Sequence, residues 1–476
     1  MSDKDPNKDP NKKPQNGNAK SVNDKAAGAK DADAPNDGAS NDGASRADSA
    51  NAQGAGPGSS VATSSDDDGE RPTEAVEGAG GHPASRADES RSMLRQITES
   101  STLVVILAIA ASLIIGGVLI VLASEEVRTT AGYFFSRPGD TLSATWNAVS
   151  GAYSAMWSGA FFNADADDLA GKIYPFMQTL TMATPLILAA LGIGIGFRAG
   201  LFNIGAQGQI VIGATLGAMV GFMWHLPTGL HLLVAVLGCA LGGALWGFIP
   251  GILRAKTGAH EVITTIMLNY IALNLVGYLL SLDAFQRPGS DNPQSPIIDA
   301  SAQYPPIFGT QFPLHLGFVV ALLAAWGVWW LMERFTLGFQ FRAVGANPAA
   351  SRTAGMSVAK STVLVMVVAG GLSGLAGSAQ ILGTQPTLTT GIAASFGFDA
   401  ITVALLGRSR PLGIVFAAIL FGGLKASGPS LQVQAGLPID IVLVVQSLIV
   451  LFIAAPPLVR FLFRLPTPKN EKEVAV

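Results

Sequence analysis

Charged residues are scarce in this chain of 476 residues: only 13% are Asp, Glu, Lys or Arg, whereas 49% are apolar. A water-soluble protein usually carries about 25% charged residues. The long uncharged stretches therefore favour a polypeptide solvated by lipid. Cysteine is also nearly absent, and the single Cys239 excludes both an intrachain disulfide and a cysteine metal site. It lies in an apolar stretch, where a free cysteine usually serves as a small packing residue.

Sequence motifs for catalysis are missing as well. The chain contains no G-x-x-x-x-G-K-[ST] phosphate loop and no G-x-S-x-G nucleophile motif. His260 and Glu261 begin like a zinc-protease motif, but Thr264 stands where the second histidine is needed. We therefore expect no enzymatic activity in this chain alone and neither a metal nor a cofactor bound to it.

The first 92 residues lack Phe, Tyr, Trp, Ile and Leu. Such a segment cannot bury enough apolar surface to offset the entropy lost on ordering, which predicts a disordered, low-complexity tail over residues 1–95. It is either a solvated extension or a docking and regulatory segment. We expect a membrane domain over 96–460 and a short C-terminal tail over 461–476.

Apolar segments follow one another through the rest of the chain, and we count ten. The first has 21 residues without a charge, enough to cross about 30 Å of hydrocarbon as a helix. This predicts an all-α polytopic membrane protein. The ten segments are Leu103–Ala123, Thr179–Phe197, Gln209–Trp224, Leu230–Ile249, Val262–Ser281, Leu314–Met332, Thr362–Leu382, Phe396–Leu406, Leu412–Lys425 and Ile439–Ala455.

The distribution of basic residues predicts the orientation of these spans. Arg91 and Arg95 precede the first span and place the N-terminus in the cytoplasm. Ten crossings then bring every basic cluster to the cytoplasmic side and leave the long loops 124–178 and 282–313 outside, so both termini are expected in the cytoplasm. The basic residues placed inside are Arg198, Arg254, Lys256, Arg334, Arg342, Arg352, Lys360, Arg408, Arg410, Arg460, Arg464, Lys469 and Lys472.

Two segments interrupt the helical pattern at membrane depth. Residues 194–209 contain five glycines together with Asn203, Gln207 and Gln209, and residues 389–407 contain the acidic Asp399. Irregular backbone in a membrane must be buried in protein or line a cavity, and paired broken segments indicate a substrate path. One such segment in each half also fits an inverted five-plus-five arrangement of the spans.

A third polar segment lies at residues 258–270, where helical spacing places Glu261, Thr265 and Asn269 on one face. Glu261 is either a first-turn residue that complements the helix dipole or part of an inner gate. Asn269 is either a hydrogen-bonding contact between helices or a pore-facing residue. Both pairs of alternatives stay open in the sequence.

A short exposed helix is predicted in the cytoplasmic loop 333–361. Asn347 suits an N-cap, Pro348 suits the first helical position and Gly355 suits the position after the helix ends. These residues predict a two-turn helix over Pro348–Ala354. With Arg352 on its surface, this helix is either a docking contact for a cytoplasmic motor or a plain connector.

These four segments together resemble the permeases of ABC importers in the branched-chain amino acid and simple-sugar group, in particular the nucleoside/simple-sugar branch. The likeness covers roughly residues 100–460. Where that family often has Glu, this chain has Gln207. The matching stretches are 197–209 (FRAGLFNIGAQGQ), 260–270 (HEVITTIMLNY), 342–348 (RAVGANP) with 354–356 (AGM), and 397–407 (GFDAITVALLG).

The resemblance implies a subunit of an ATP-driven importer in a bacterial plasma membrane. It implies a cytoplasmic ATP-binding subunit that uses the ATP, a second related permease, an extracytoplasmic substrate-binding lipoprotein and surrounding lipids, and no nucleic acid. The expected substrates are nucleosides or simple sugars, because amide and hydroxyl side chains suit both. The expected substrate path comprises Asn203, Gln207, Gln209, Asn269, Tyr270 and Asp399; the expected gate is Glu261; and the expected coupling residues are Asn347, Pro348, Arg352 and Gly355.

An ion-coupled secondary carrier is the main alternative. It would also use inverted repeats and broken helices, but it needs a site for protons or sodium ions. Asp399 is the one attractive intramembrane acid for that purpose. Such a carrier does not need the predicted docking helix.

Overall fold

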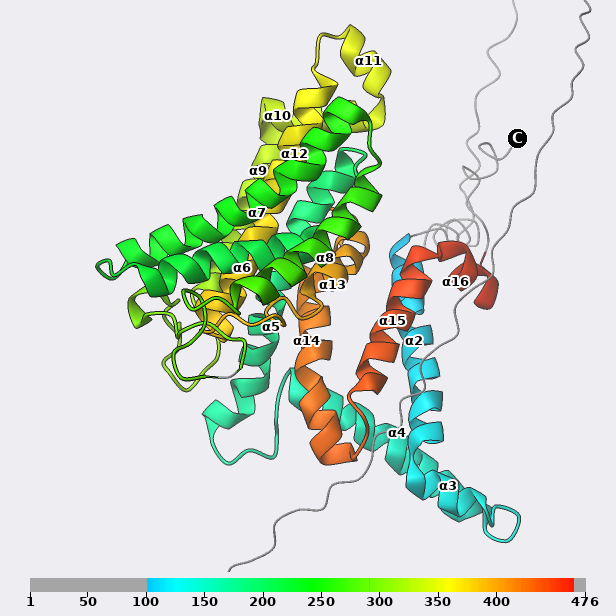
Figure 1. The fold of residues 1–476 in the computed structure, drawn as a ribbon. Helices are drawn as coiled ribbons and strands as arrows, with labels where there is room; N and C mark the ends of the chain where they lie inside the picture. Colours follow the sequence, from blue (N-terminus) through cyan, green and yellow to red (C-terminus); the bar gives the residue numbers. More distant parts are fainter. Residues whose placement is uncertain (1–100, 291, 466–476) are drawn as a thin grey trace, which may run out of the picture. The chain divides into compact units, whose positions relative to one another are not determined.

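A computed structural model describes residues 101–290 and 292–465, and all regular elements in these ranges are helical. The predicted tail over 1–95 and residues 466–476 of the predicted C-terminal tail lie outside the described residues. The helices, shown in Figure 1, are α2 (Ser101–Ala123), α3 (Glu125–Ala131), α4 (Pro138–Ala160), α5 (Leu169–Arg198), α6 (Ala206–Met223), α7 (Leu230–Thr257), α8 (Glu261–Leu279), the 3₁₀ turn η1 (Ala300–Ala302), α9 (Gly317–Arg334), α10 (Thr336–Ala346), α11 (Pro348–Thr353), α12 (Val358–Ser378), the π-helical turn η2 (Ala379–Thr384), α13 (Phe396–Leu406), α14 (Pro411–Ala435), α15 (Asp440–Ala454) and α16 (Pro456–Leu462).

The all-helical membrane fold is confirmed, but the count of ten spans is not. Eight helices in the described ranges are long and apolar enough to cross a membrane, and the bent pair α15–α16, with 96° between its parts, makes up to nine. The difference arises at α13, whose 11 residues rise only about 16 Å and cannot cross the hydrocarbon as a helix. Hydropathy identified this segment correctly as apolar but could not show its depth.

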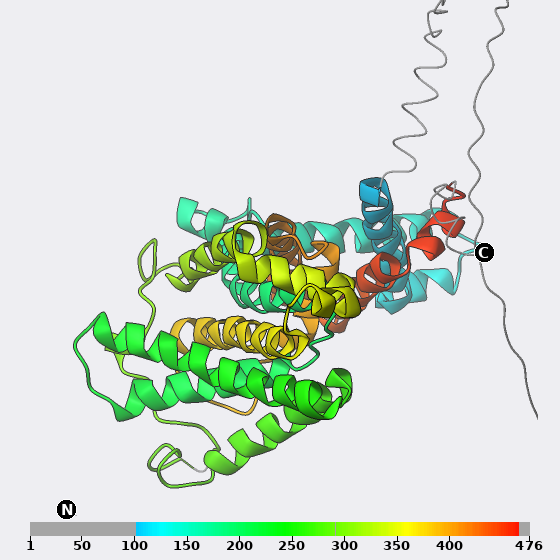
Figure 2. The ribbon, with the colours of Figure 1, turned by 90° about the horizontal axis from the view of Figure 1, so that it is seen from above.

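The most buried long helices of the bundle are α5, α6 and α12, and α7 packs against α6 and α12 from outside. Most of α5 beyond Thr179 is buried, which explains why it is apolar all round rather than on one face. Glycines bring α7 and α12 into backbone contact: a Cβ at Gly243 would collide with Gly370 and Gly374. Such close approach lets the helices associate by van der Waals packing, because apolar lipid provides no hydrophobic driving force between them. The two helices lie side by side in Figure 2.

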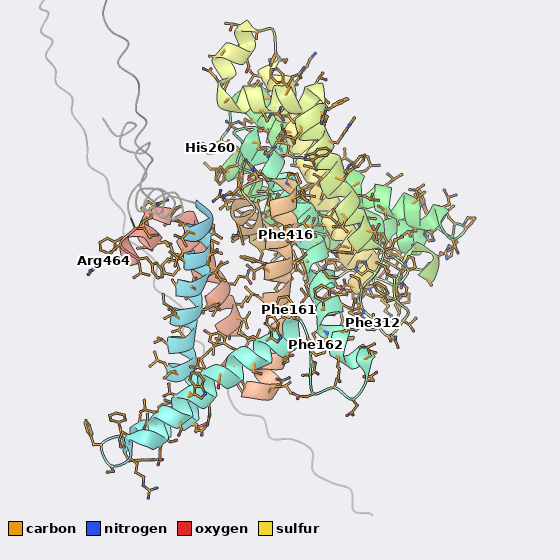
Figure 3. The ribbon with its side chains drawn as sticks, turned by 180° about the vertical axis from the view of Figure 1, so that it is seen from behind. Phe161, Phe162, His260, Phe312, Phe416 and Arg464 are labelled. Carbon is orange, nitrogen blue, oxygen red and sulfur yellow. The ribbon has the colours of Figure 1, made fainter. Side chains whose placement is uncertain are left out.

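A second cluster joins α2 to α4, α14 and α15 through residues such as Ile120, Met156 and Val442. Helix α4 buries small residues against these neighbours and leaves Trp146 and Trp157 exposed. Phe161 and Phe162 follow its end (Figure 3). One face of α4 therefore packs in the protein, while its tryptophans lie on the protein surface.

The connection between α8 and α9 is held against the chain that follows η2. Ser295 N donates to Leu388 O (3.0 Å), Ile298 N donates to Pro386 O (3.0 Å), and Leu388 N donates to Ser295 Oγ (2.9 Å). Within this connection the ring of His315 stacks on Tyr304 at 5.5 Å between centroids. The long loop is thus an ordered part of the bundle.

Burial of His315 predicts a pH-dependent stability. Its ring is 3% exposed, and this burial lowers the pKa from 6.5 to about 4. As pH falls below 6.5, His315 binds a proton in the unfolded chain but stays neutral in the folded protein. The stability present above pH 6.5 is therefore lost progressively down to pH 4. We expect a loss of about 3 kcal/mol over that window. Thermal unfolding of wild type and His315→Gln between pH 7.5 and 4.5 measures it, and parallel pH profiles would contradict it.

Candidate functional site

The first broken segment, residues 194–209, contains a non-helical stretch between α5 and α6. Residues 199–205 leave α5, pass through Gly200 at φ +68° and enter α6 at Ala206. A side chain at Gly200 would be strained by this backbone angle and would press on the backbone of Gly345. The interruption predicted from the glycines is therefore present, and it lies against the chain that leads to α11.

Three of the predicted site residues hold this segment by their side-chain amides. Asn203 and Gln209, each 1% exposed, donate to one another (3.0 and 3.3 Å), and Asn203 Oδ1 also accepts from Gly205 N. Asn269 of α8 donates to Ile204 O (3.0 Å) and accepts from Gly208 N (2.8 Å). Of the two interpretations left open for Asn269, the geometry is that of a contact between helices.

Tyr270 does not join these amides. Its side chain is 62% exposed on the outer face of α8, one residue after Asn269 and therefore pointing away from it. The structure separates Tyr270 from the buried polar cluster, so this predicted lining residue lies on a surface rather than at the centre of the bundle.

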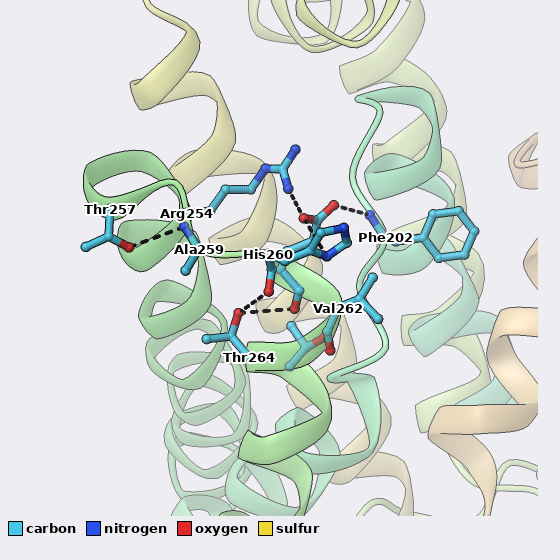
Figure 4. Close-up of polar contacts among 9 residues, drawn as sticks. Phe202, Arg254, Thr257, Ala259, His260, Val262 and Thr264 are labelled. Atoms are coloured by element: carbon cyan, nitrogen blue, oxygen red, sulfur yellow. Dashed lines mark hydrogen bonds and ion pairs between the residues drawn. The ribbon is translucent and has the colours of Figure 1, made fainter. Parts of the chain in front are cut away.

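Glu261 connects three elements, and its partners Arg254, His260 and Phe202 are labelled in Figure 4. Its carboxylate forms an ion pair with Arg254 of α7, lies 3.7 Å from His260 Nδ1 and accepts from Phe202 N in the broken segment (3.4 Å). Glu261 is also the first residue of α8, so the position suits the helix dipole as well. Sequence reasoning named Glu261 but missed Arg254, although a buried carboxylate next to a basic helix end signals such a partner.

Gln207 joins the two broken segments directly. Its Nε2 donates to Ala394 O (2.6 Å), and its Oε1 accepts from Gly397 N (2.9 Å). A neutral amide is suited to this position because it donates and accepts at once. Segments 187 or more residues apart in sequence therefore meet at one side chain.

Replacing Gln207 by leucine removes both bonds and leaves Ala394 O and Gly397 N without that partner. We expect the free energy of unfolding to fall by about 1–2 kcal/mol, the range for hydrogen bonds between membrane helices. Gln432→Leu is the matched control, because Gln432 is exposed and its side chain forms no hydrogen bond with the described residues. Equal unfolding midpoints for the two variants would show that the bridge carries no stability.

Asp399 lies in a polar network formed by α13, α14 and α15. Its carboxylate pairs with Lys425 Nζ (2.8 Å) and accepts from Ser395 Oγ (2.7 Å) and Gln446 Nε2 (2.9 Å). The side chains of Asp399 and Lys425 are only 16% and 15% exposed. Lys425 was missed as a partner, although a lone cation inside an apolar span is itself a signal that a carboxylate is near.

The short helix predicted in the loop 333–361 is confirmed as α11, which ends one residue earlier than expected. Asn347 Oδ1 accepts from Ala350 N (3.0 Å), Pro348 occupies the first helical position and Gly355 follows at φ +82°. Apart from Ser351, residues 348–353 are exposed. The caps give a rigid two-turn helix at one end of the bundle (Figure 1).

No group of three potential metal ligands occurs among the described residues. The polar side chains instead tie irregular backbone together inside a bundle of apolar helices. A multi-pass helical membrane protein with two broken segments joined by hydrogen bonds has the architecture of a transport protein.

The comparison with known families identifies this transporter class. The model of the family described as "Branched-chain amino acid transport system / permease component" matches residues 176–454, more than half of the chain. The chain belongs to this permease family.

Relatives with assigned roles are numerous. The chain is 41% identical over 322 residues to a guanosine ABC transporter permease protein of Bacillus subtilis, which covers 66% of this chain and 88% of the relative. It is 38% identical over 307 residues to a nucleoside ABC transporter permease protein of Lactococcus lactis (61% and 81%) and 36% identical over 285 residues to a glucose ABC transporter permease protein of Haloferax volcanii (58% and 75%). No solved structure matches the chain significantly.

Proposed function

We propose that this chain is the transmembrane permease subunit of an ATP-driven ABC importer of nucleosides. The observation that carries the proposal is the 41% identity to a guanosine permease across 88% of that relative's length. A second nucleoside permease follows at 38%, and the glucose permease at 36% makes simple sugars the second substrate class to test.

The substrate path is proposed to run beside the two broken segments. Gln207 joins them, while Asn203, Gln209 and Asn269 fix the backbone of the first. Tyr270 on the exposed face of α8 would meet the substrate or the second permease. Asp399 would act through its network with Lys425 by holding α13 in place.

Glu261 is the proposed inner gate. Its ion pair with Arg254 and its bond to Phe202 N join α7, α8 and the broken segment at one end of the bundle. Movement of α7 relative to α8 would have to break a partly buried charge pair, and movement of the broken segment would have to break the bond to Phe202 N. Such a pair gives two discrete arrangements rather than a gradual opening.

The assembly is proposed to include subunits that the family usually needs. A cytoplasmic ATP-binding subunit would dock on α11, and an extracytoplasmic lipoprotein would deliver the substrate. A second permease is supported by Bacillus subtilis, where another guanosine ABC transporter permease protein is 25% identical to this chain. We propose a cell-membrane location with both termini in the cytoplasm, in line with the positive-inside rule.

Uptake of radiolabelled guanosine, uridine and glucose tests the substrate class. A strain that lacks this chain is compared with the same strain carrying it, at equal membrane levels. The proposal expects nucleoside uptake to disappear on deletion and return on complementation while glucose uptake stays unchanged. Restoration of glucose uptake alone would overturn the nucleoside assignment.

A further inference from the structure

A large cavity lies at the end of the bundle where α5 and α9 finish and where α13 turns into α14. Its volume is about 900 Å³, which is within the range of small-molecule sites. The side chains named for the substrate path do not line it, although Arg198, Leu406 and Gly407 at the ends of the two broken segments do. Its lining includes Arg198, Trp329, Arg334, Arg408, Arg410 and Leu412.

Four arginines from three separate parts of the fold converge on this cavity. Arg198 is paired with Glu333 at 3.0 Å. The side chains of Arg334, Arg408 and Arg410 form no ion pair or hydrogen bond with any residue in the described ranges. All three side chains are exposed, and together they border one hollow with three unpaired positive charges, which suits an anionic ligand.

The turn that presents two of these arginines is held in a fixed, unusual conformation. Arg408 and Ser409 have φ values of 51° and 52°, a region that non-glycine residues seldom adopt. The turn is closed by Gly407, where a Cβ would collide with the backbone of Gly413 and Ile414. It leads straight into the first turn of α14, whose free N–H groups add positive potential to the same cavity.

Part of the cavity lining is apolar and exposed. Leu412 is 74% exposed and Trp329 is 43% exposed, and Val105 belongs to the largely unburied span α2. The site therefore has a basic part, formed by arginines at helix ends, and an apolar part, formed by a tryptophan and an exposed leucine. A free inorganic anion has no apolar surface that could contact the apolar part, and an acidic protein segment does not require such a contact.

We propose that this cavity binds the headgroup of an anionic phospholipid, with the acyl chains lying along Trp329 and Leu412. The arginine forks suit a phosphate geometrically, and basic pockets between membrane helices bind acidic headgroups by the same chemistry. The lipid links the end of α9 to the α13–α14 turn and so stabilises the half-length helix α13. The inference does not depend on which solute the protein carries.

Photo-crosslinking of the unaltered full-length chain tests the site without any substitution. The chain is placed in phosphatidylcholine vesicles that contain a trace of photoactivatable phosphatidylglycerol or photoactivatable phosphatidylcholine, and crosslinked peptides are mapped. The proposal expects the phosphatidylglycerol probe to label the peptides that contain Trp329 and residues 405–413. Equal labelling by both probes, or protection of the site by millimolar inorganic phosphate, would overturn it.

Native mass spectrometry of variants gives the second arm. R408A/R410A should retain about thirtyfold less phosphatidylglycerol than wild type, since each of the two basic residues near a headgroup is worth about 1 kcal/mol, or about 2 kcal/mol together. R408K/R410K should recover most of the retention by keeping the charge. The matched control R128A/R137A removes two exposed arginines from around α3 and the start of α4 and should change nothing. Equal losses in the control and the test variant would refute a built site.

Discussion

Replacing Lys425 by methionine is expected to lower the free energy of unfolding by about 3–5 kcal/mol, because it leaves the carboxylate of Asp399 charged and unpaired inside the protein. The two charged atoms are 2.8 Å apart, and both side chains are largely buried. Asp399→Leu should cost a similar amount by leaving the ammonium group of Lys425 unpaired. The double variant D399L/K425M should recover most of the loss, since replacing a whole buried pair by apolar residues is often neutral.

A double-mutant cycle on thermal unfolding in detergent measures this coupling. Strictly additive single effects would show that the two charges do not depend on each other. The same variants also separate structure from transport. If the double variant folds as well as wild type and still takes up substrate, Asp399 serves to hold α13. If it folds well and takes up nothing, Asp399 takes part in the path itself.

Reversing the charge of Arg352 is expected to reduce substrate uptake by about tenfold or more while leaving the amount of protein in the membrane unchanged. Arg352 is exposed on α11, the rigid two-turn helix that we propose as the docking site of the ATP-binding subunit. A charge facing a partner of opposite sign costs several kcal/mol when it is inverted. The measurement is uptake normalised to membrane level for Arg352→Glu.

Two further variants sharpen that experiment. Asn347→Ala removes the helix cap, which costs about 1 kcal/mol locally, and should reduce uptake by a smaller factor than the charge reversal. Arg128→Glu changes the same charge on α3, in a loop predicted to lie outside, and should leave uptake intact. Full activity of Arg352→Glu would favour the plain connector that the sequence left open.

The parts of the fold that follow from local chemistry were predictable. Asn347, Pro348 and Gly355 are helix start and stop signals that act within a few residues. Helix α11 begins and ends almost where they indicate. The glycines of residues 194–209 likewise predicted an interruption, and Gly200 adopts the left-handed conformation there. Such signals need no knowledge of the rest of the chain.

The parts that depend on distant partners were not predictable from one sequence. Hydropathy marks Phe396–Leu406 as apolar but contains no information on how far it extends across the membrane, so the count of ten spans was not confirmed. The bond from Gln207 to Ala394 joins residues 187 positions apart, and nothing local specifies it. The Asp399–Lys425 pair could have been predicted from the sequence, because a charged residue in an apolar span usually pairs with one of opposite charge.

The energy source of uptake tests the central claim most directly. Cells that carry this chain would be given radiolabelled guanosine after ionophores collapse the proton and sodium gradients with ATP maintained, and separately after ATP depletion with gradients intact. An ABC permease predicts uptake that persists without gradients, stops without ATP and is absent from the deletion strain. Uptake that survives ATP depletion and collapses with the gradients would contradict the account and establish an ion-coupled carrier.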